Sequence, residues 1–274
     1  MTTKLFHYAL LTSLIITGAC NKDNPTENPS NNPPDYLLKS ISWNNGMTAH
    51  LSYHADSSLK NIDYTFQSSS GKSVFTWSGK KLTEFYSDRS LNKNLFEYDQ
   101  QGRVIKMHNT AKAGVSDGYF LEFKYNAQNK LDSLKFFFVN IVGEHLQSST
   151  SYHYSSAGEL EAAITKTPTG ILTHSINTYS PPVSFNPCNY IETTLSENYI
   201  IYNYALMCQL SKVNKLPTKV TRTVKNGSQP SSVDKIEEQT FTVTNHRIDK
   251  VVTAISFPAA PGNNATIESV YSYF

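Results

Sequence analysis

The sequence predicts an all-β protein, an antiparallel meander of repeated hairpins that forms a strongly curved sheet or an open barrel. Three observations support this fold class. From about residue 37 onward, Tyr, Phe, Val, Ile, Thr and Ser dominate, and these residues suit a pleated, half-buried surface. The segments align on one another as internal repeats. Residues that favour tight turns recur at fixed positions between the aligned segments.

Three stretches of the sequence align without gaps, and they start at Phe96, Phe123 and Tyr152. In each stretch, aromatic residues occupy the first and third positions, which share one face of a strand because side chains alternate. An aliphatic residue two positions after the turn restarts the apolar pattern on the returning strand. We expect the aromatic residues to form the repeated core, and they are Phe96, Tyr98, Phe123, Tyr125, Tyr152 and Tyr154.

The seventh position of each stretch is a glycine or an asparagine, the residues that tolerate a left-handed backbone. A type I turn followed by a bulge requires such a residue in a hairpin. Two shorter repeats, which start at Phe75 and Phe241, carry the same residues at the turn, and a further unit has Ser57 there. The predicted hairpin turns contain Gly79, Gly102, Asn129, Gly158 and Asn245.

The hairpins follow one another from residue 51 to about residue 255, so they predict one long meander. A sheet of this length must curl, close or pair to cover its edges, and we expect roughly 12 to 16 strands. Lysines such as Lys106, Lys124 and Lys135 interrupt the apolar band that a membrane-spanning barrel needs. We therefore expect the sheet to stand outside the lipid.

The N-terminus has the three parts of an export signal. A single positive charge at Lys4 precedes an apolar run from Leu5 to Ile16 and small residues before Cys20. This run is shorter than the about 20 residues of a spanning helix. The following stretch is rich in Asn and Pro, which predicts an extended tether. The predicted organisation is a signal peptide at 1–19, a lipidated disordered tether at 20–36 and one β domain at 37–274.

Two motifs resemble those of known families. Gly18-Ala19-Cys20 resembles the lipobox of bacterial lipoproteins, which implies cleavage before Cys20 and lipid attachment to its thiol. The stretch from Phe96 to Val104 resembles the Tyr-Asp repeat of Rhs and teneurin-like proteins. With the leader and the tether, the whole chain resembles Bacteroidetes lipoproteins that contain a domain of unknown function with a porin-like fold. This resemblance implies an outer-membrane lipoprotein on the cell surface or the periplasmic face, and it implies no activity.

Two further cysteines, Cys188 and Cys208, lie 20 residues apart in an irregular part of the sequence. In an oxidising compartment a disulfide between them would close that loop and stabilise the protein. Two buried free thiols are the alternative.

Several classes of function find no support in the sequence. The 24 Lys and Arg residues nearly balance the 22 Asp and Glu residues, which argues against a nucleic-acid partner. The sequence contains no nucleophile elbow, no His-Glu-x-x-His helix and no glycine-rich phosphate loop. His50 and His54 would lie roughly 13 Å apart on a strand, too far to share a metal. We expect no enzyme activity, no cofactor and no metal site.

The leading hypothesis is a lipid-anchored, non-enzymatic binding or adhesion module of the cell envelope. Its partners would be the membrane, through the N-terminal lipid, and a glycan or an envelope protein. One alternative is a structural or assembly subunit of an outer-membrane complex. An envelope-polymer hydrolase is the third hypothesis.

Overall fold

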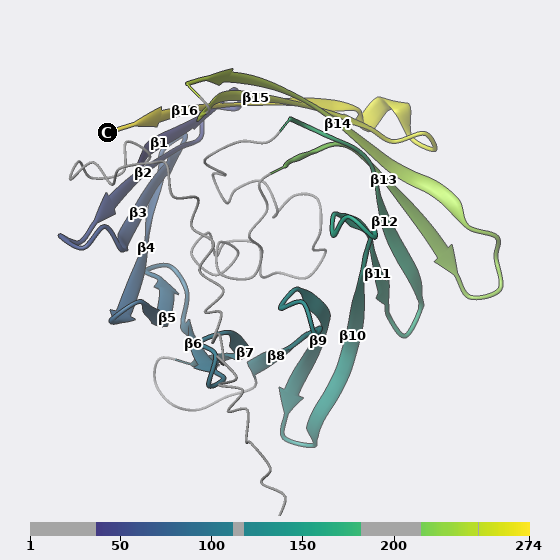
Figure 1. Ribbon diagram of the computed structural model, residues 1–274, viewed down its shortest axis with the longest axis horizontal. Coiled ribbons are helices and arrows are strands. Elements are labelled where there is room, and N and C mark those ends of the chain that lie inside the picture. The colour runs from purple at the N-terminus through teal and green to yellow at the C-terminus, as the bar shows by residue number, and fades with distance from the viewer. Residues whose placement is uncertain (1–36, 112–117, 182–214, 246) are drawn as a thin grey trace, which may run out of the picture. The chain divides into compact units, whose positions relative to one another are not determined.

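The computed structural model describes residues 37–111, 118–181, 215–245 and 247–274. The chain divides into two compact units, Met1–Pro34 and Asp35–Phe274, and all of the described residues lie in the second. In this unit the strands form a closed antiparallel barrel in which each strand pairs with its neighbours in the chain. Figure 1 shows the strands following one another around a ring from β1 to β16.

Sixteen strands make up the barrel, and a short 3₁₀ turn, η2 (Pro261–Asn263), precedes the last of them. The strands are β1 (Leu38–Trp43), β2 (Thr48–Tyr53), β3 (Leu59–Phe66), β4 (Ser69–Ser78), β5 (Lys81–Ser87), β6 (Asn92–Tyr98), β7 (Val104–Ala111), β8 (Gly118–Tyr125), β9 (Leu131–Asn140), β10 (Gly143–Tyr154), β11 (Leu160–Lys166), β12 (Gly170–Tyr179), β13 (Pro217–Asn226), β14 (Ser232–Thr244), β15 (Arg247–Ser256) and β16 (Ala265–Tyr273).

The predicted all-β meander of hairpins is confirmed, and the structure adds that the barrel is closed. Closure comes from β1 and β16, which pair with Ile41 opposite Tyr271. Both strands lie outside the aligned repeats, so the repeats alone left open how the sheet ends. Pairing the first strand with the last removes both exposed edges, which would otherwise be templates for aggregation.

Along the strands, side chains alternate between a largely buried inner face and an outer face that carries many polar and charged residues. The register carries the buried set from strand to strand, for example from Ile41 to Ala49 and from Leu51 to Ile62. The alternate positions hold charged residues, such as Asp63 opposite Lys72 on β3 and β4. The two faces of the wall therefore meet different surroundings.

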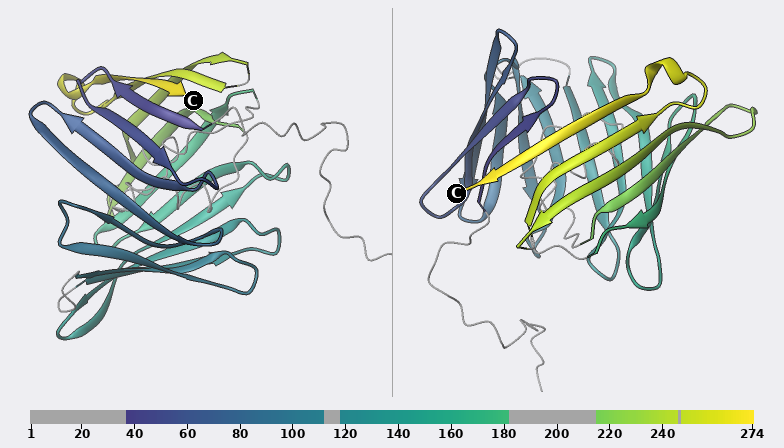
Figure 2. Two further views of the ribbon diagram at one scale, coloured as in Figure 1. Left: turned by 90° about the vertical axis from the view of Figure 1, so that its left-hand side faces the viewer. Right: turned by 90° about the horizontal axis from the view of Figure 1, so that it is seen from above.

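The five residues predicted at hairpin turns all lie between strands and have positive φ angles: Gly79 (56°), Gly102 (77°), Asn129 (60°), Gly158 (81°) and Asn245 (50°). In the turn after β6, the N–H of Gly102 donates to the carbonyl of Asp99 at 3.0 Å. The same bond recurs after β8, from Asn129 to Asn126 at 3.0 Å. These turns share one end of the barrel, here called the repeat rim, which is formed by the connections that follow even-numbered strands (Figure 2).

A β-bulge follows each of these turns and interrupts the pairing between neighbouring hairpins. In the hairpin of β6 and β7, the register shifts between Glu97 and Tyr98. The pairing of β7 with the next strand, β8, starts only at Lys106, two residues beyond Val104. The carbonyl of Val104 therefore lies beyond the last backbone pair with β8.

An aromatic side chain from the next strand bonds to this carbonyl. The hydroxyl of Tyr125 donates to the carbonyl of Val104 at 2.8 Å, and the same contact recurs around the barrel. We call the donors the aromatic ladder, and the bonds run from Tyr53 to Leu38, Trp77 to Leu59, Tyr98 to Leu82, Tyr125 to Val104, Tyr154 to Leu131, Tyr179 to Leu160 and Tyr273 to Ile248. At the corresponding end of β14 the residue is Val243, which has no group that could donate such a bond.

Cations cover several rings of the aromatic ladder. The guanidinium of Arg103 lies 4.6 Å from the ring centroid of Tyr125, and that of Arg247 lies 4.8 Å from the centroid of Tyr273. Each cation stands one residue before the aliphatic residue whose carbonyl accepts the bond. Burial raises the pKa of Tyr154 to about 12, so its hydroxyl keeps the proton that it donates. Stacking and hydrogen bonding thus hold the same ring.

Replacing Tyr125 with Phe should lower the free energy of unfolding by about 1 to 2 kcal/mol, because the Val104 carbonyl loses its donor while the ring is kept. Urea denaturation measures the change. Tyr119→Phe is the matched control, since no hydrogen bond of the Tyr119 hydroxyl occurs within the described ranges. An equal loss of stability in the two variants would contradict a structural role for the ladder bond.

Candidate functional site

The inner wall of the barrel divides into an apolar part and a polar part. From β1 to β9 its buried members are mainly apolar, and they include Ile41, Ile62, Phe75, Phe85, Met107 and Leu121. From β10 to β14 they are mainly polar, and they include Ser148, Thr150, Thr165, His174, Glu237 and Gln239. Buried polar groups cost free energy unless they find partners, so the polar part is where specific contacts concentrate.

A cluster of ionisable residues lies in this polar part, on β12 to β14, and we call it the inner-wall cluster. It consists of His174 on β12, Arg222 on β13, and Lys235 and Glu237 on β14. The backbone register sets His174 opposite Arg222, and Arg222 opposite Lys235. Glu237 follows Lys235 by two residues and therefore shares its face of the strand.

The charges in the inner-wall cluster are paired. The ammonium of Lys235 lies 3.1 Å from Oε1 of Glu237, whose side chain is only 3% exposed. Arg222 forms an ion pair with Asp234. Among the described residues, Oε2 of Glu237 has no hydrogen-bond partner. The cluster thus places two cations next to a carboxylate oxygen that has no hydrogen-bond partner among the described residues.

Burial changes the protonation of two members of the inner-wall cluster. Burial, with the nearby Lys235 and Arg222, lowers the pKa of His174 to about 4, so this histidine is neutral near pH 7. Burial raises the pKa of Glu237, and the contact with Lys235 opposes the rise. A mixed set of donors and acceptors of this kind suits a polar, uncharged group such as a sugar hydroxyl.

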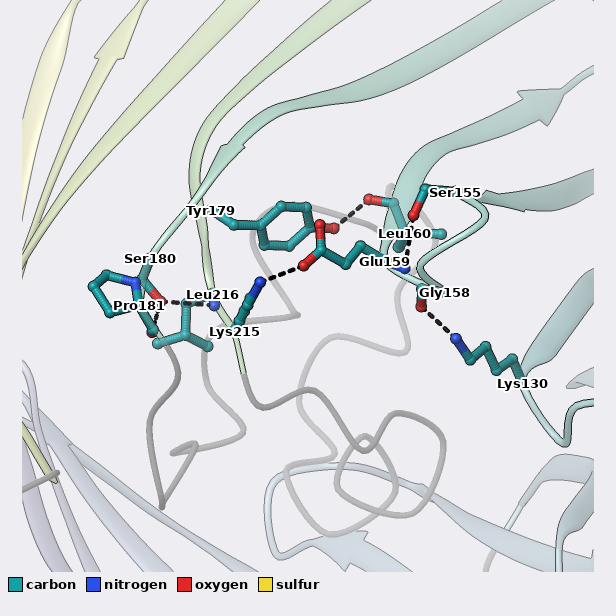
Figure 3. Close-up of polar contacts among 10 residues, drawn as sticks. All are labelled: Lys130, Ser155, Gly158, Glu159, Leu160, Tyr179, Ser180, Pro181, Lys215 and Leu216. Atoms are coloured by element: carbon teal, nitrogen blue, oxygen red, sulfur yellow. Dashed lines mark hydrogen bonds and ion pairs between the residues drawn. The ribbon is translucent and has the colours of Figure 1, made fainter.

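A second polar network lies on the repeat rim between β10 and β13, where a long connection replaces a short turn (Figure 3). The hairpin of β10 and β11 has Glu159 at the repeat position that Arg103 and Lys130 occupy in other hairpins. The ammonium of Lys215 lies 2.5 Å from Oε1 of Glu159. Because the residue at this position is acidic here rather than basic, it can form an ion pair with Lys215, which lies just before β13.

Hydrogen bonds around Ser180 join the two ends of this connection. The N–H of Ser180 donates to the carbonyl of Leu216 at 2.8 Å, and the N–H of Leu216 donates to the hydroxyl oxygen of Ser180 at 3.0 Å. Leu216 is fully buried. The chain therefore leaves β12 and enters β13 at fixed positions, as Figure 3 shows.

Several residues singled out in the sequence lie outside the described residues. These are Cys20, the predicted site of lipid attachment, and Cys188 and Cys208, the predicted disulfide pair. Within the described ranges no three or more His, Cys, Asp and Glu side chains gather in a way that could hold a metal ion. Those ranges also contain no helix long and apolar enough to cross a membrane.

The sequence alone did not predict the inner-wall cluster or the hydrogen bonds of the aromatic ladder. The inner-wall cluster comes from strands whose charged residues show no motif, so only the register brings them together. The aromatic ladder did leave a signal, because the third repeat position is Tyr in Tyr98, Tyr125 and Tyr154. A purely apolar role would allow Phe there as well, so the repeated hydroxyl indicated a bond.

Comparisons with known proteins give a likeness of fold. No family model and no curated protein matches the sequence. A porin-like protein from Bacteroides uniformis is similar in structure, with a TM-score of 0.59, 12% identity, and coverage of 88% of this chain and 98% of the other. A porin-like protein from Bacteroides vulgatus gives a TM-score of 0.60 at 9% identity, with coverage of 87% and 99%. A chain of the Photorhabdus luminescens Tc holotoxin pore matches at a TM-score of 0.29 and 12% identity, over 83% of this chain and 15% of the other.

The buried His174 predicts how stability depends on pH. Between about pH 6.5 and pH 4 the unfolded chain protonates this histidine and the folded chain does not, so stability falls as the pH falls. The free energy of unfolding of the parent protein should fall between pH 7 and pH 4.5, and in His174→Gln this fall should be smaller by about 2 to 3 kcal/mol. Glu237 works in the opposite direction, because its raised pKa favours the folded state as the pH falls.

Urea denaturation of the parent protein and of His174→Gln, each at pH 7.0 and pH 4.5, measures the difference in their pH dependence. His153→Gln serves as the control, since His153 is an exposed residue on the outer face of β10. An unchanged pH dependence in His174→Gln would show that the pKa of His174 is the same in the folded and unfolded chains, which would contradict the lowered pKa.

Proposed function

We propose that this chain is a lipid-anchored protein of the bacterial cell envelope and that its barrel is a non-enzymatic module that binds a glycan or an envelope protein. The observation that carries the proposal is the charge on the outer wall. A barrel with a charged wall stands in water and needs a separate attachment to stay at a membrane. The predicted lipid on Cys20 supplies that attachment.

Cross-strand ion pairs occur on widely separated parts of the outer wall. Lys72 pairs with Asp63 at 3.1 Å between β4 and β3, and Lys250 pairs with Glu268 at 2.7 Å between β15 and β16. Similar pairs join β5 with β6 and β13 with β14. A lysine facing lipid at the bilayer midplane costs about 2 to 4 kcal/mol, so a wall with several such charges is unfavourable in a membrane.

The inner wall supports binding of a polar ligand. Its polar part combines the cations Arg222 and Lys235 with the acceptor oxygen of Glu237, and hydroxyl-rich glycans need both kinds of partner. The porin-like fold of the two Bacteroides proteins is consistent with an envelope setting. An assembly subunit remains the alternative from another class, and an envelope-polymer hydrolase is the third.

Lipid anchoring predicts that radiolabelled palmitate enters the full chain when it is produced in a bacterium with a lipoprotein pathway. Cys20→Ser should lose the label completely, because the acylated thiol is gone. Cys188→Ser keeps Cys20 and should stay labelled. An unlabelled parent protein, or a labelled Cys20→Ser variant, would contradict the anchor.

Binding predicts that an array of envelope glycans, or a pull-down from envelope extract, gives a partner for the parent protein. Glu237→Gln should weaken glycan binding at least tenfold, because the amide replaces an acceptor oxygen with a donor. Lys72→Gln on the outer wall is the control and should bind like the parent. Co-purification at fixed stoichiometry would favour an assembly subunit. Cleavage of an envelope polymer would favour the hydrolase.

A further inference from the structure

Large apolar side chains are exposed at the barrel end opposite the repeat rim, which we call the second rim. It is formed by the connections that follow odd-numbered strands. The exposed residues at or near these connections come from three hairpins: Phe66 from β3 and β4, Leu91 from β5 and β6, and Phe138, Ile141, Val142 and Leu146 from β9 and β10. Exposed apolar residues that gather in one region indicate a surface that is covered in use.

The tip of the hairpin formed by β9 and β10 is the clearest case. Its two connecting residues, Ile141 and Val142, are 99% and 79% exposed. Connections of this length usually hold Asn, Asp or Gly rather than aliphatic residues. The side chain of Asn140 accepts hydrogen bonds from the N–H groups of Val142 at 2.8 Å and Gly143 at 3.2 Å. The turn is therefore ordered, and it presents both aliphatic side chains outward.

We propose that the second rim inserts these apolar tips into the surface of a lipid bilayer. The residues belong to hairpins spread from β3 to β10, and a flat surface can touch several tips of one rim at once. A protein pocket would take a single tip. The charged outer wall confines the contact with lipid to the tips, so the insertion is shallow.

The proposal rests on the lipid anchor of the proposed function, and the geometry of the chain permits it. A chain with as many residues as the predicted tether, 20–36, can reach at most about 50 Å, at the rise of a polyproline helix. A strand of ten residues spans about 33 Å. The tether is thus long enough for the second rim to reach the membrane, although β1 starts at the repeat rim. Arg89, an exposed cation beside Leu91, suits the phosphates of lipid headgroups.

Quenching by brominated lipids tests this contact in the full lipidated chain, reconstituted into phosphatidylethanolamine and phosphatidylglycerol vesicles. In Ile141→Trp the added indole should lose at least half of its emission when the acyl chains carry bromine near the headgroup. Val243→Trp is the matched control, since Val243 is 46% exposed on the repeat rim. Its added indole should keep its emission. The signal of Trp43 and Trp77 is subtracted with the parent protein.

Equal emission of Ile141→Trp with and without bromine, in a chain that floats with the vesicles, would overturn the insertion and leave the anchor intact. A chain that does not float would instead count against the anchor. A second measurement uses the unlipidated Cys20→Ser chain and the same vesicles. Adding Ile141→Asp and Val142→Asp should reduce the sedimented fraction at least fivefold, whereas Val243→Asp should not. If the tip emission responds to an envelope protein and not to brominated lipid, the occupant is a protein and the proposal is wrong.

Discussion

The barrel depends on the bond between an aromatic side chain and a backbone carbonyl that recurs along the repeat rim at every even-numbered strand except β14. The bulge after every turn ends the pairing between neighbouring hairpins two residues early, as at Val104. The Tyr125 hydroxyl replaces the lost backbone donor while its ring packs in the core. One residue thus joins two hairpins, and repeating it around the rim turns a series of marginal hairpins into a single closed sheet.

Closure separates two environments, and the polarity of the wall follows from that separation. The outer face carries ion pairs such as Lys72 with Asp63, while most of the inner face is apolar. A barrel of this polarity is the inverse of a transmembrane barrel, which is apolar outside and polar inside. The likeness to the porin-like proteins is therefore one of shape.

The inner-wall cluster interrupts the apolar pattern of the inner wall. Burying its charged groups costs desolvation free energy, and ion pairing within the cluster reduces that cost. Lys235 and Glu237 form a buried ion pair, and His174 avoids the cost by remaining neutral near pH 7. Apolar residues at these positions would fill the wall without such compensation. Buried polar groups that persist against this cost mark positions with a role in recognition or in fixing the fold. The cluster is for this reason the part of the wall that we connect with a ligand.

Local patterns in the sequence determined the all-β class, the meander and the turn residues, because they depend on side-chain alternation and on which residues tolerate positive φ. Gly102 and Asn129 illustrate this, since each can be assigned from its own repeat unit. Tertiary structure alone decided the closure between β1 and β16 and the meeting of His174, Arg222 and Lys235. Those contacts join residues far apart in the chain, and the register that sets them arises only when the whole sheet curves back on itself.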